Sequence, residues 1–366
     1  MPVTWSNLFD GKTAAEKAYS VIERARAKAT LVSIPYHVPE LTLPVPLPSL
    51  AQIENCADVL KMLSRGCKVV RINQHYVVKF GENVDAIEGQ NMLYVARHTR
   101  IPIPRVYAIY QDIRRNPRDV KTYIVMQNIH GTTLRTAWPT MAEAEKEFVA
   151  EKLKGYFKQL RKIPSEGYYG SLGPSYLRDS LFWHQGDSRQ IRNYAGPFAT
   201  EALLMEGMLN SYQKFRTDAM GGRRLEFYRR RMHEIFRKHK PVFSHGDLCL
   251  RNIMIQKFPA VSLPITGMDD NLSASAKLKQ RFLNLRMPRK PSIAPEEGSE
   301  AFVVTIIDWE KAGWWPSYWE YALAWSDFRW KNDWEKYFER VIEPNIIVSP
   351  WIYWLRREAS TPISLS

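Results

Sequence analysis

Two short polar segments of this 366-residue chain carry residue types that could hold a metal ion and a phosphate. The first reads His-Gly-Asp-Leu-Cys-Leu-Arg-Asn and places Asp247 and Asn252 five residues apart, just before the apolar run 253–255. The second places Asp308 at the end of the β-like run 302–307. Carboxylate and amide oxygens are the hard ligands that Mg²⁺ prefers, and Mg²⁺ commonly shares them with substrate phosphates. The pattern therefore predicts one site for a metal ion and a phosphorylated ligand.

The same two segments resemble the aminoglycoside phosphotransferase and choline kinase branch of the kinase-like superfamily. The resemblance is closest to fungal proteins that carry HGDL, a following Asn and IDWE.AG..P.YWEY, and it extends from about Gly66 to Trp325. It implies an α+β, bilobal protein-kinase-like fold, with a small antiparallel β-sheet lobe and a larger, mainly helical lobe. It also implies an ATP- and Mg²⁺-dependent phosphotransferase that transfers the γ-phosphate to a hydroxyl of a small molecule.

The resemblance implies a role for each polar residue of the two motifs. Asp247 matches the catalytic aspartate, which orients the substrate hydroxyl or accepts its proton. Asn252 and Asp308 match the two metal ligands. His245 is expected to brace the catalytic loop, because Asp247 already supplies the base. Each residue alone could be a loop cap or a turn former, but the set beside β-like runs favours the metal site.

A lysine in an apolar strand is the next candidate. Lys79 lies in Tyr-Val-Val-Lys-Phe, where a buried ammonium needs a charged partner. In a helix over 84–98, Glu88 would share one face with Met92 and Val95 and would point to the packing side. The resemblance implies that a Lys79–Glu88 pair holds the nucleotide phosphates. The alternative is an edge-strand lysine and a surface glutamate.

The remaining nucleotide-binding features are weaker. Gly66 is the only glycine between Leu63 and Ile72, so no G-x-G-x-x-G loop is present. The segment around Gln127 and Ile129 resembles the connection between the lobes, where the carbonyl of Gln127 and the amide of Ile129 would meet the adenine edge of ATP. The alternative for this segment is a simple buried strand.

Two lobes of different character must position these residues. Residues 51–130 are predicted to form a small nucleotide-binding β lobe, and 131–366 a helical catalytic lobe. Residues 1–50 are predicted to be an N-terminal helix and a proline-rich connector, and 257–300 a mobile insertion without sustained periodicity. The elements expected are a helix at 13–28, strands at 67–72, 75–80, 105–110 and 121–129, and helices at 84–98, 141–162, 198–217 and 223–239.

The net charge of +14 has one main location. Much of it lies in 221–240, where Leu225, Tyr228 and Met232 share one helical face and the arginines lie opposite. Such a basic stripe could bind nucleic acid or an anionic lipid surface. No nucleic-acid-binding motif accompanies it, so a solvated helix face is expected.

Aromatic residues crowd the segment after the second motif. Carboxylates at Glu310 and Glu320 are interleaved with tryptophans, and such a cluster could recognise an ammonium-bearing substrate. The favoured alternative is that the rings anchor the helical lobe. The tryptophans are Trp309, Trp314, Trp315, Trp319 and Trp325.

Composition narrows the class of protein. A hydrophobic fraction of 45% excludes a mainly disordered chain, and three cysteines give no disulfide framework. No stretch approaches 18 consecutive apolar residues, so a soluble cytoplasmic protein without a membrane span is expected. Its expected ligands are ATP, Mg²⁺ and a small-molecule hydroxyl substrate, with no nucleic acid. The alternative is a catalytically idle kinase-like scaffold or binding protein, which typically lacks some of the catalytic polar residues present here.

Overall fold

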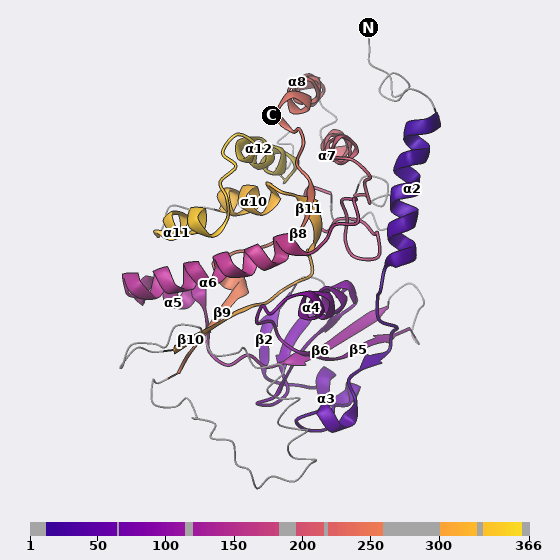
Figure 1. Ribbon diagram of the computed structural model, residues 1–366. Coiled ribbons are helices and arrows are strands. Elements are labelled where there is room, and N and C mark those ends of the chain that lie inside the picture. Colours follow the sequence, from indigo (N-terminus) through magenta and orange to yellow (C-terminus); the bar gives the residue numbers. More distant parts are fainter. Residues whose placement is uncertain are drawn as a thin grey trace.

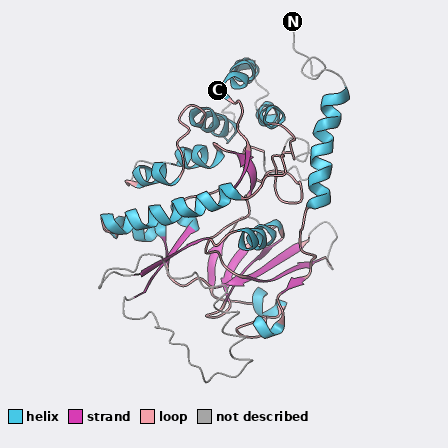
Figure 2. Cartoon of the chain, viewed as in Figure 1, coloured by secondary structure: helices cyan, strands magenta, loops and turns pink. Residues whose placement is uncertain are grey.

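The computed structural model describes residues 12–63, 66–113, 120–182, 195–215, 219–258, 301–327 and 332–360. Figure 1 shows a sheet-rich lobe built from residues 36–127 and a helix-rich lobe built from most of the rest, with helix α2 (Lys12–Lys28) running beside the helix-rich lobe. Figure 2 shows the same division, with the broad sheet on one side and most helices on the other. Nearly all of the predicted insertion 257–300 lies outside the described residues.

Six strands form the antiparallel sheet of the small lobe, in the order β1-β5-β6-β4-β3-β2. The strands are β1 (Tyr36–His37), β2 (Val59–Met62), β3 (Lys68–Arg71), β4 (Tyr76–Gly81), β5 (Val106–Asp112) and β6 (Lys121–Gln127). β3 and β4 form the predicted hairpin, with Val70 opposite Val78. The proline-rich connector contributes β1, which pairs with β5 at the sheet edge. β2 is absent from the prediction because its four residues are all exposed and show no alternation.

Side-chain alternation along the strands separates two cores on the two faces of the sheet. Ile124 of β6 packs in the core that includes α4 (Ile87–His98), whereas Tyr123 packs in the core that includes α3 (Leu50–Glu54). Figure 1 places α4 and α3 on opposite faces of the sheet. Lys79 lies opposite Ile124 in the β4–β6 register, so it shares the face covered by α4.

Helices form most of the second lobe. They are α5 (Leu134–Ala137), α6 (Glu143–Lys162), α7 (Glu201–Phe215), α8 (Ala219–Ile235), α10 (Trp319–Asp327), α11 (Trp334–Val341) and α12 (Ser349–Ser360). The strands are β7 (Thr132–Thr133), β8 (Pro241–Ser244), β9 (Ile253–Phe258), β10 (Ala301–Ile306) and β11 (Gly313–Pro316). Other elements are α2 (Lys12–Lys28) and the 3₁₀ turns η1 (Glu40–Thr42), η3 (Trp138–Thr140) and η5 (Leu250–Asn252).

Two small sheets of the second lobe position the polar motifs. β9 pairs with both β7 and β10, and β8 pairs with β11. The first motif connects β8 to β9, and the second connects β10 to β11. Both motifs therefore leave paired strands as short loops.

The tryptophans after Asp308 are core residues. Trp315 stacks on Trp319 with ring centroids 4.3 Å apart, and this pair belongs to the core of the helical lobe. Trp325 is half-buried and meets the ring of Tyr353 edge-on. Four rings are at most 1% exposed, which leaves them no surface for an ammonium ligand. These rings are Trp309, Trp314, Trp315 and Trp319.

α8 presents its basic stripe to solvent, as its periodicity predicts. Tyr228 and Met232 are buried against the helical core, while Arg230 on the opposite face is exposed. Part of the charge is paired, since Arg224 lies 3.2 Å from Glu358. Neither α8 nor any other described helix combines the length and apolarity needed to cross a membrane.

Candidate active site

The loop between β8 and β9 is held by a buried histidine. His245 has no exposed surface, and its Nε2 lies 3.0 Å from the carbonyl oxygen of Ile307. Its Nδ1 accepts a hydrogen bond from the backbone N–H of Asp247 at 3.2 Å. Because Nδ1 is an acceptor, we assign the ring proton to Nε2, which donates to Ile307. Both ring nitrogens are therefore engaged in bracing the loop.

Glu320 of α10 holds the other side of this loop and is absent from the predicted site. Its buried carboxylate accepts hydrogen bonds from the backbone N–H groups of Gly246 (2.9 Å) and Leu248 (3.0 Å). Gly246 has φ +77°, and a Cβ there would lie 2.5 Å from the carbonyl oxygen of Lys311, so the position requires glycine. The signal for Glu320 is the segment Tyr-Trp-Glu-Tyr, where a glutamate among core aromatics must find polar partners.

Asp247 is fixed through both of its carboxylate oxygens. The side-chain Nδ2 of Asn252 donates to Oδ2 of Asp247 at 3.1 Å and to its backbone carbonyl at 2.9 Å. The Nζ of Lys311 lies 3.3 Å from Oδ1, and the guanidinium of Arg251 lies 3.6 Å from Oδ2. The Asp247 side chain is 22% exposed, so a ligand can reach it. Since Nδ2 of Asn252 faces Asp247, the side-chain oxygen of Asn252, Oδ1, is directed away from Asp247 and can contact another ligand.

Asp308 follows β10 and is brought to the same loop by its neighbour Ile307. The N–H of Ile307 donates to the carbonyl of Asn252 at 2.9 Å, while the carbonyl of Ile307 faces His245. Asp308 itself has φ +67°, which is uncommon for a residue with a Cβ. At this turn its Oδ1 accepts a hydrogen bond from Nζ of Lys79 at 2.8 Å. The two polar motifs and β4 therefore meet at one place.

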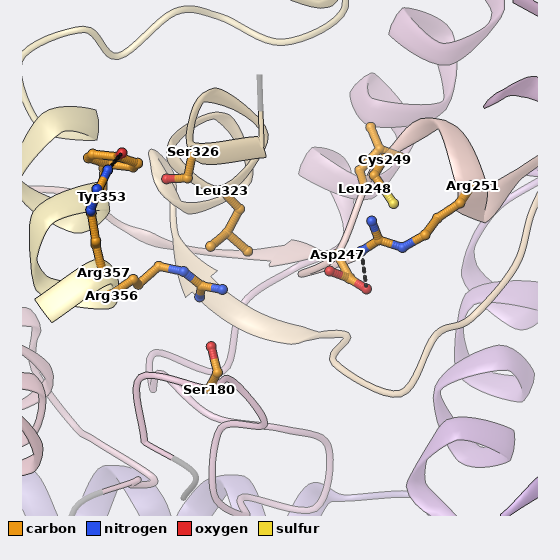
Figure 3. A pocket seen from close by; sticks show the side chains of 10 residues that line it. All are labelled: Ser180, Asp247, Leu248, Cys249, Arg251, Leu323, Ser326, Tyr353, Arg356 and Arg357. Carbon is orange, nitrogen blue, oxygen red and sulfur yellow. Dashed lines mark hydrogen bonds and ion pairs between the residues drawn. The ribbon is translucent and has the colours of Figure 1, made fainter. Parts of the chain in front are cut away.

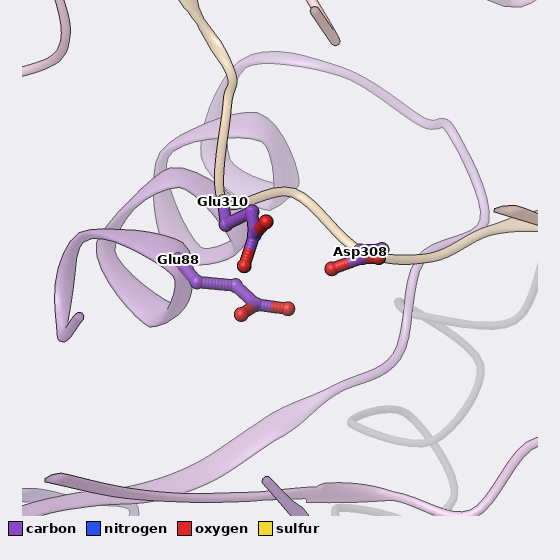
Figure 4. A group of neighbouring side chains, drawn as sticks. All are labelled: Glu88, Asp308 and Glu310. Atoms are coloured by element: carbon purple, nitrogen blue, oxygen red, sulfur yellow. The ribbon is translucent and has the colours of Figure 1, made fainter. Parts of the chain in front are cut away.

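Lys79 is surrounded by three carboxylates, which point toward one another in Figure 4. Its Nζ lies 2.7 Å from Glu88, 2.8 Å from Asp308 and 2.9 Å from Glu310. The structure thus contains the predicted Lys79–Glu88 pair. It adds Glu310 to the cluster, a residue that was not predicted there although it lies only two positions after Asp308. Three carboxylates exceed the charge of one ammonium, so the cluster attracts a further cation.

Burial and charge act in opposite directions on these groups. Burial raises the pKa of Glu88, the Lys79 ammonium lowers it, and the other two carboxylates raise it further, for a net rise. Burial also acts to raise the pKa of Asp308, but Lys79, with further contributions from Lys61 and His245, outweighs burial and holds that pKa below its usual value. For Lys79, burial acts to lower the pKa and the carboxylates raise it well above the ordinary value. Lys79 and Asp308 are therefore both charged at neutral pH.

Gln127 is the last residue of β6, and Ile129 lies between β6 and β7, in the connection between the lobes. The N–H of Gln127 donates to the carbonyl of Arg105 at 2.8 Å, which keeps Gln127 on the side of β5. The backbone N–H of the next residue, Asn128, donates to the carbonyl oxygen of His75, which directly precedes β4. Ile129 is half-buried and lies two residues after the end of β6. The structure thus places both residues at the connection and outside the Lys79 cluster.

Comparison with known proteins identifies the family. A model of the phosphotransferase enzyme family matches residues 67–262, more than half of the chain. This chain belongs to the phosphotransferase enzyme family. The bilobal α+β fold that the resemblance implies is confirmed by the six-stranded antiparallel sheet of the small lobe and the helices of the second lobe. No curated protein matches the chain.

Solved structures similar to this phosphotransferase are of low sequence identity. One is a thermostable mutant of aminoglycoside phosphotransferase APH(4)-Ia, with 17% identity and a TM-score of 0.47, covering 81% of this chain and 83% of that chain. Another is the GDP and kanamycin complex of APH(2")-IIia, with 14% identity and a TM-score of 0.40, covering 80% of this chain and 84% of that chain.

A cavity of about 280 Å³ borders Asp247 in this phosphotransferase (Figure 3). The loop between β8 and β9 forms one wall, α10 and α12 form another, and Ser180 completes it. In Figure 3, Arg356 extends from α12 into the space between Ser180 and Leu323. The residues that line the cavity are Ser180, Asp247, Leu248, Cys249, Arg251, Leu323, Ser326, Tyr353, Arg356 and Arg357.

Proposed function

We propose that this member of the family transfers the γ-phosphoryl group of ATP to a hydroxyl of a small molecule, with Mg²⁺ as cofactor. The observation that supports this most strongly is the convergence of Lys79, Asp308 and the Asp247 loop, which come from three distant parts of the sequence. Phosphoryl transfer depends mainly on positioning and charge neutralisation, and both are properties of this arrangement.

Asp247 is the residue that would meet the acceptor hydroxyl. Its carboxylate borders a cavity and is held by Asn252 and Lys311, so its orientation is set before a ligand arrives. A carboxylate within hydrogen-bond reach of a hydroxyl orients it and accepts its proton as the new O–P bond forms. His245 is not available for this step, since both ring nitrogens are engaged in the loop.

The residues around Asp308 fit a magnesium ion by their donor chemistry. Asp308 offers a carboxylate with a lowered pKa, and Asn252 has an amide oxygen directed away from Asp247. Glu310 brings a further carboxylate oxygen within 4.8 Å of the oxygen of Asp308. When bound there, Mg²⁺ would neutralise charge on the nucleotide phosphates. Lys79 would add a second positive charge beside them, and Gln127 with Ile129 would meet the adenine.

The proposed reaction belongs in the cytoplasm, where ATP is the phosphoryl donor. Cys56, Cys67 and Cys249 are free thiols, which fits a reducing compartment. The complete polar set also argues against an idle scaffold, because each catalytic position holds the residue type that phosphoryl transfer needs.

The test is nucleotide consumption by the full chain, measured with Mg²⁺ and a panel of amino alcohols, sugars, hydroxy acids and aminoglycosides. Asp247→Ala is expected to lower turnover about 10³-fold, since a positioned general base contributes about 10²- to 10⁴-fold. Binding of the non-hydrolysable nucleotide AMP-PNP, measured by calorimetry, should be retained in this variant. The matched control is Asp58→Ala, which removes an exposed carboxylate of the small lobe. Undiminished turnover in Asp247→Ala would contradict the proposal.

A further inference from the structure

The second polar motif ends in a tight turn that runs from Trp309 to Ala312. The N–H of Ala312 donates to the carbonyl of Trp309 at 3.2 Å and closes this turn. Glu310 and Lys311 are its two central residues. The turn directly follows Asp308, whose φ of +67° is uncommon for a residue with a Cβ, so the backbone conformation here must be held by the surrounding structure.

The two central residues of the turn contact different parts of the site. The carboxylate of Glu310 lies 2.9 Å from Nζ of Lys79. The Nζ of Lys311 lies 3.3 Å from the carboxylate of Asp247. A displacement of the turn would change both contacts at once. Its position therefore matters to the carboxylate cluster around Lys79 and to the loop that carries Asp247.

Asn91 of α4 holds both ends of this turn. Its Nδ2 donates to the carbonyl of Trp309 at 2.8 Å and to the carbonyl of Ala312 at 3.2 Å. The residue has no exposed surface. Asn91 lies three residues after Glu88 in α4, which places the two side chains on one side of the helix. The same side of α4 thus supplies a carboxylate to Lys79 and an amide to the turn.

Packing alone does not explain an amide at this position. The Oδ1 of Asn91 is buried and has no hydrogen-bond partner within the described part of the chain. An unpartnered buried acceptor destabilises a fold, and a leucine of similar size would avoid it. The hydrogen bonds to the turn are therefore what distinguishes asparagine from an apolar residue here.

We propose that Asn91 is a positioning residue for phosphoryl transfer. Its amide fixes the turn that directs Glu310 and Lys311 to their partners, and it joins the small lobe to the second lobe at that point. This inference rests on the proposed function, because the turn belongs to the same site. Phosphoryl transfer depends mainly on positioning, so small displacements of these groups lower its rate.

Gln90, the neighbouring residue of α4, provides a matched control. It is also buried, and its amide also makes two hydrogen bonds to backbone atoms. The N–H of Val32 donates to Oε1 of Gln90 at 2.9 Å, and Nε2 of Gln90 donates to the carbonyl of Val32 at 2.8 Å. Val32 belongs to the connector that follows α2. Replacing Gln90 therefore removes the same number of hydrogen bonds from α4 but leaves the turn in place.

The test compares Asn91→Leu with Gln90→Leu in the full chain. The kcat and KM are measured with ATP, Mg²⁺ and the best acceptor of the panel above, and AMP-PNP binding is measured by calorimetry with and without Mg²⁺. We expect Asn91→Leu to lower kcat about 10- to 100-fold, with little change in the KM for the acceptor. Mg²⁺ should also strengthen AMP-PNP binding less than in the wild type. Gln90→Leu should keep the wild-type kcat and Mg²⁺ dependence.

Urea denaturation separates this role from a loss of stability. Both leucine variants should remain folded and should lose a similar free energy of unfolding, because each loses two hydrogen bonds. Asn91→Ala is a second variant that leaves room for water beside the two carbonyls of the turn. It should show the same loss in kcat as Asn91→Leu.

The outcomes separate this inference from the proposed function. A folded Asn91→Leu or Asn91→Ala with the wild-type kcat and Mg²⁺ dependence would overturn the inference, as would an equal loss of kcat in Gln90→Leu. Failure of both Asn91 variants to fold would assign the residue to the stability of the lobe contact and would overturn it as well. The loss of turnover in Asp247→Ala would stand in each case. A wild-type chain that binds no AMP-PNP with Mg²⁺ would instead overturn the proposed function.

Discussion

Two neighbouring regions of the candidate site are built from ion pairs of different composition. Around Lys79, three carboxylates surround one ammonium. Beside Asp247, Arg251 and Lys311 pair with Asp247, and Arg356 pairs with the buried Asp179. Both regions are built from ion pairs, but around Lys79 the carboxylates of the described residues exceed the ammonium, which suits a metal ion. The comparison shows that the count of charges around a site, rather than the presence of an ion pair, indicates its ligand.

The same contrast appears in the pKa values of two buried carboxyl groups. Burial raises the pKa of Glu88, and the nearby carboxylates Asp308 and Glu310 raise it further, so Lys79 alone does not offset them. Burial acts in the same direction on Asp179, but Arg356 and Lys311 outweigh it and lower the pKa. Equal burial thus leads to opposite shifts because the neighbours differ.

The strongest test of the anionic region around Lys79 removes its proposed metal ligand. Asp308→Ala is expected to lower turnover with ATP and Mg²⁺ about 10³-fold, because an electrostatic contact to the reacting phosphates is lost. Calorimetry should show that Mg²⁺ no longer strengthens AMP-PNP binding. Asp308→Asn retains an amide oxygen and should lose less. A magnesium dependence equal to that of the wild type in Asp308→Ala would remove Asp308 from the metal site.

The region beside Asp247 can be tested by removing the partner of its buried carboxylate. Arg356→Ala leaves Asp179 without its main partner, and the free energy of unfolding should fall by about 3 kcal/mol, as for other broken buried pairs. The double variant Asp179→Asn with Arg356→Gln should recover most of that loss, since no buried charge remains. Urea denaturation followed by circular dichroism measures both. Equal stabilities of the single and the double variant would show that the pair is not coupled.

Glu320 connects the two regions because it fixes the loop that carries Asp247. Glu320→Gln keeps the size of the side chain but weakens two charge-assisted hydrogen bonds, and we expect kcat to fall about 10-fold. As a positioning residue, it should leave AMP-PNP affinity unchanged, in contrast to Asp308. A loss of nucleotide affinity parallel to the loss in kcat would assign Glu320 a general structural role instead.

The sequence predicts local features of this fold better than it predicts how distant segments share a site. The hairpin around Lys79 and the long helices follow from hydrophobic periodicity, and Asp247, Asn252 and Asp308 stand in motifs with fixed spacing. The roles of Glu310 and Glu320 are not predictable in this way, because each depends on a partner far away in the chain. The contact of Arg356 with Asp179 is harder still to predict, since the α12 segment has no motif and the two residues are far apart in the sequence.

The smallest expected effect is the pH dependence that Asp179 gives to stability. Despite burial, which acts to raise it, Arg356 and Lys311 hold the pKa of Asp179 below its ordinary value of 3.8. A lowered pKa in the folded state means that the unfolded state binds more protons, so the contribution is complete above pH 3.8 and is lost as pH falls through the folded pKa. The free energy of unfolding, measured by urea titration between about pH 3 and pH 6, should therefore decline less steeply on acidification in the Asp179→Asn, Arg356→Gln double variant than in the wild type. Parallel curves for the two proteins would mean that Arg356 and Lys311 do not hold Asp179 ionised.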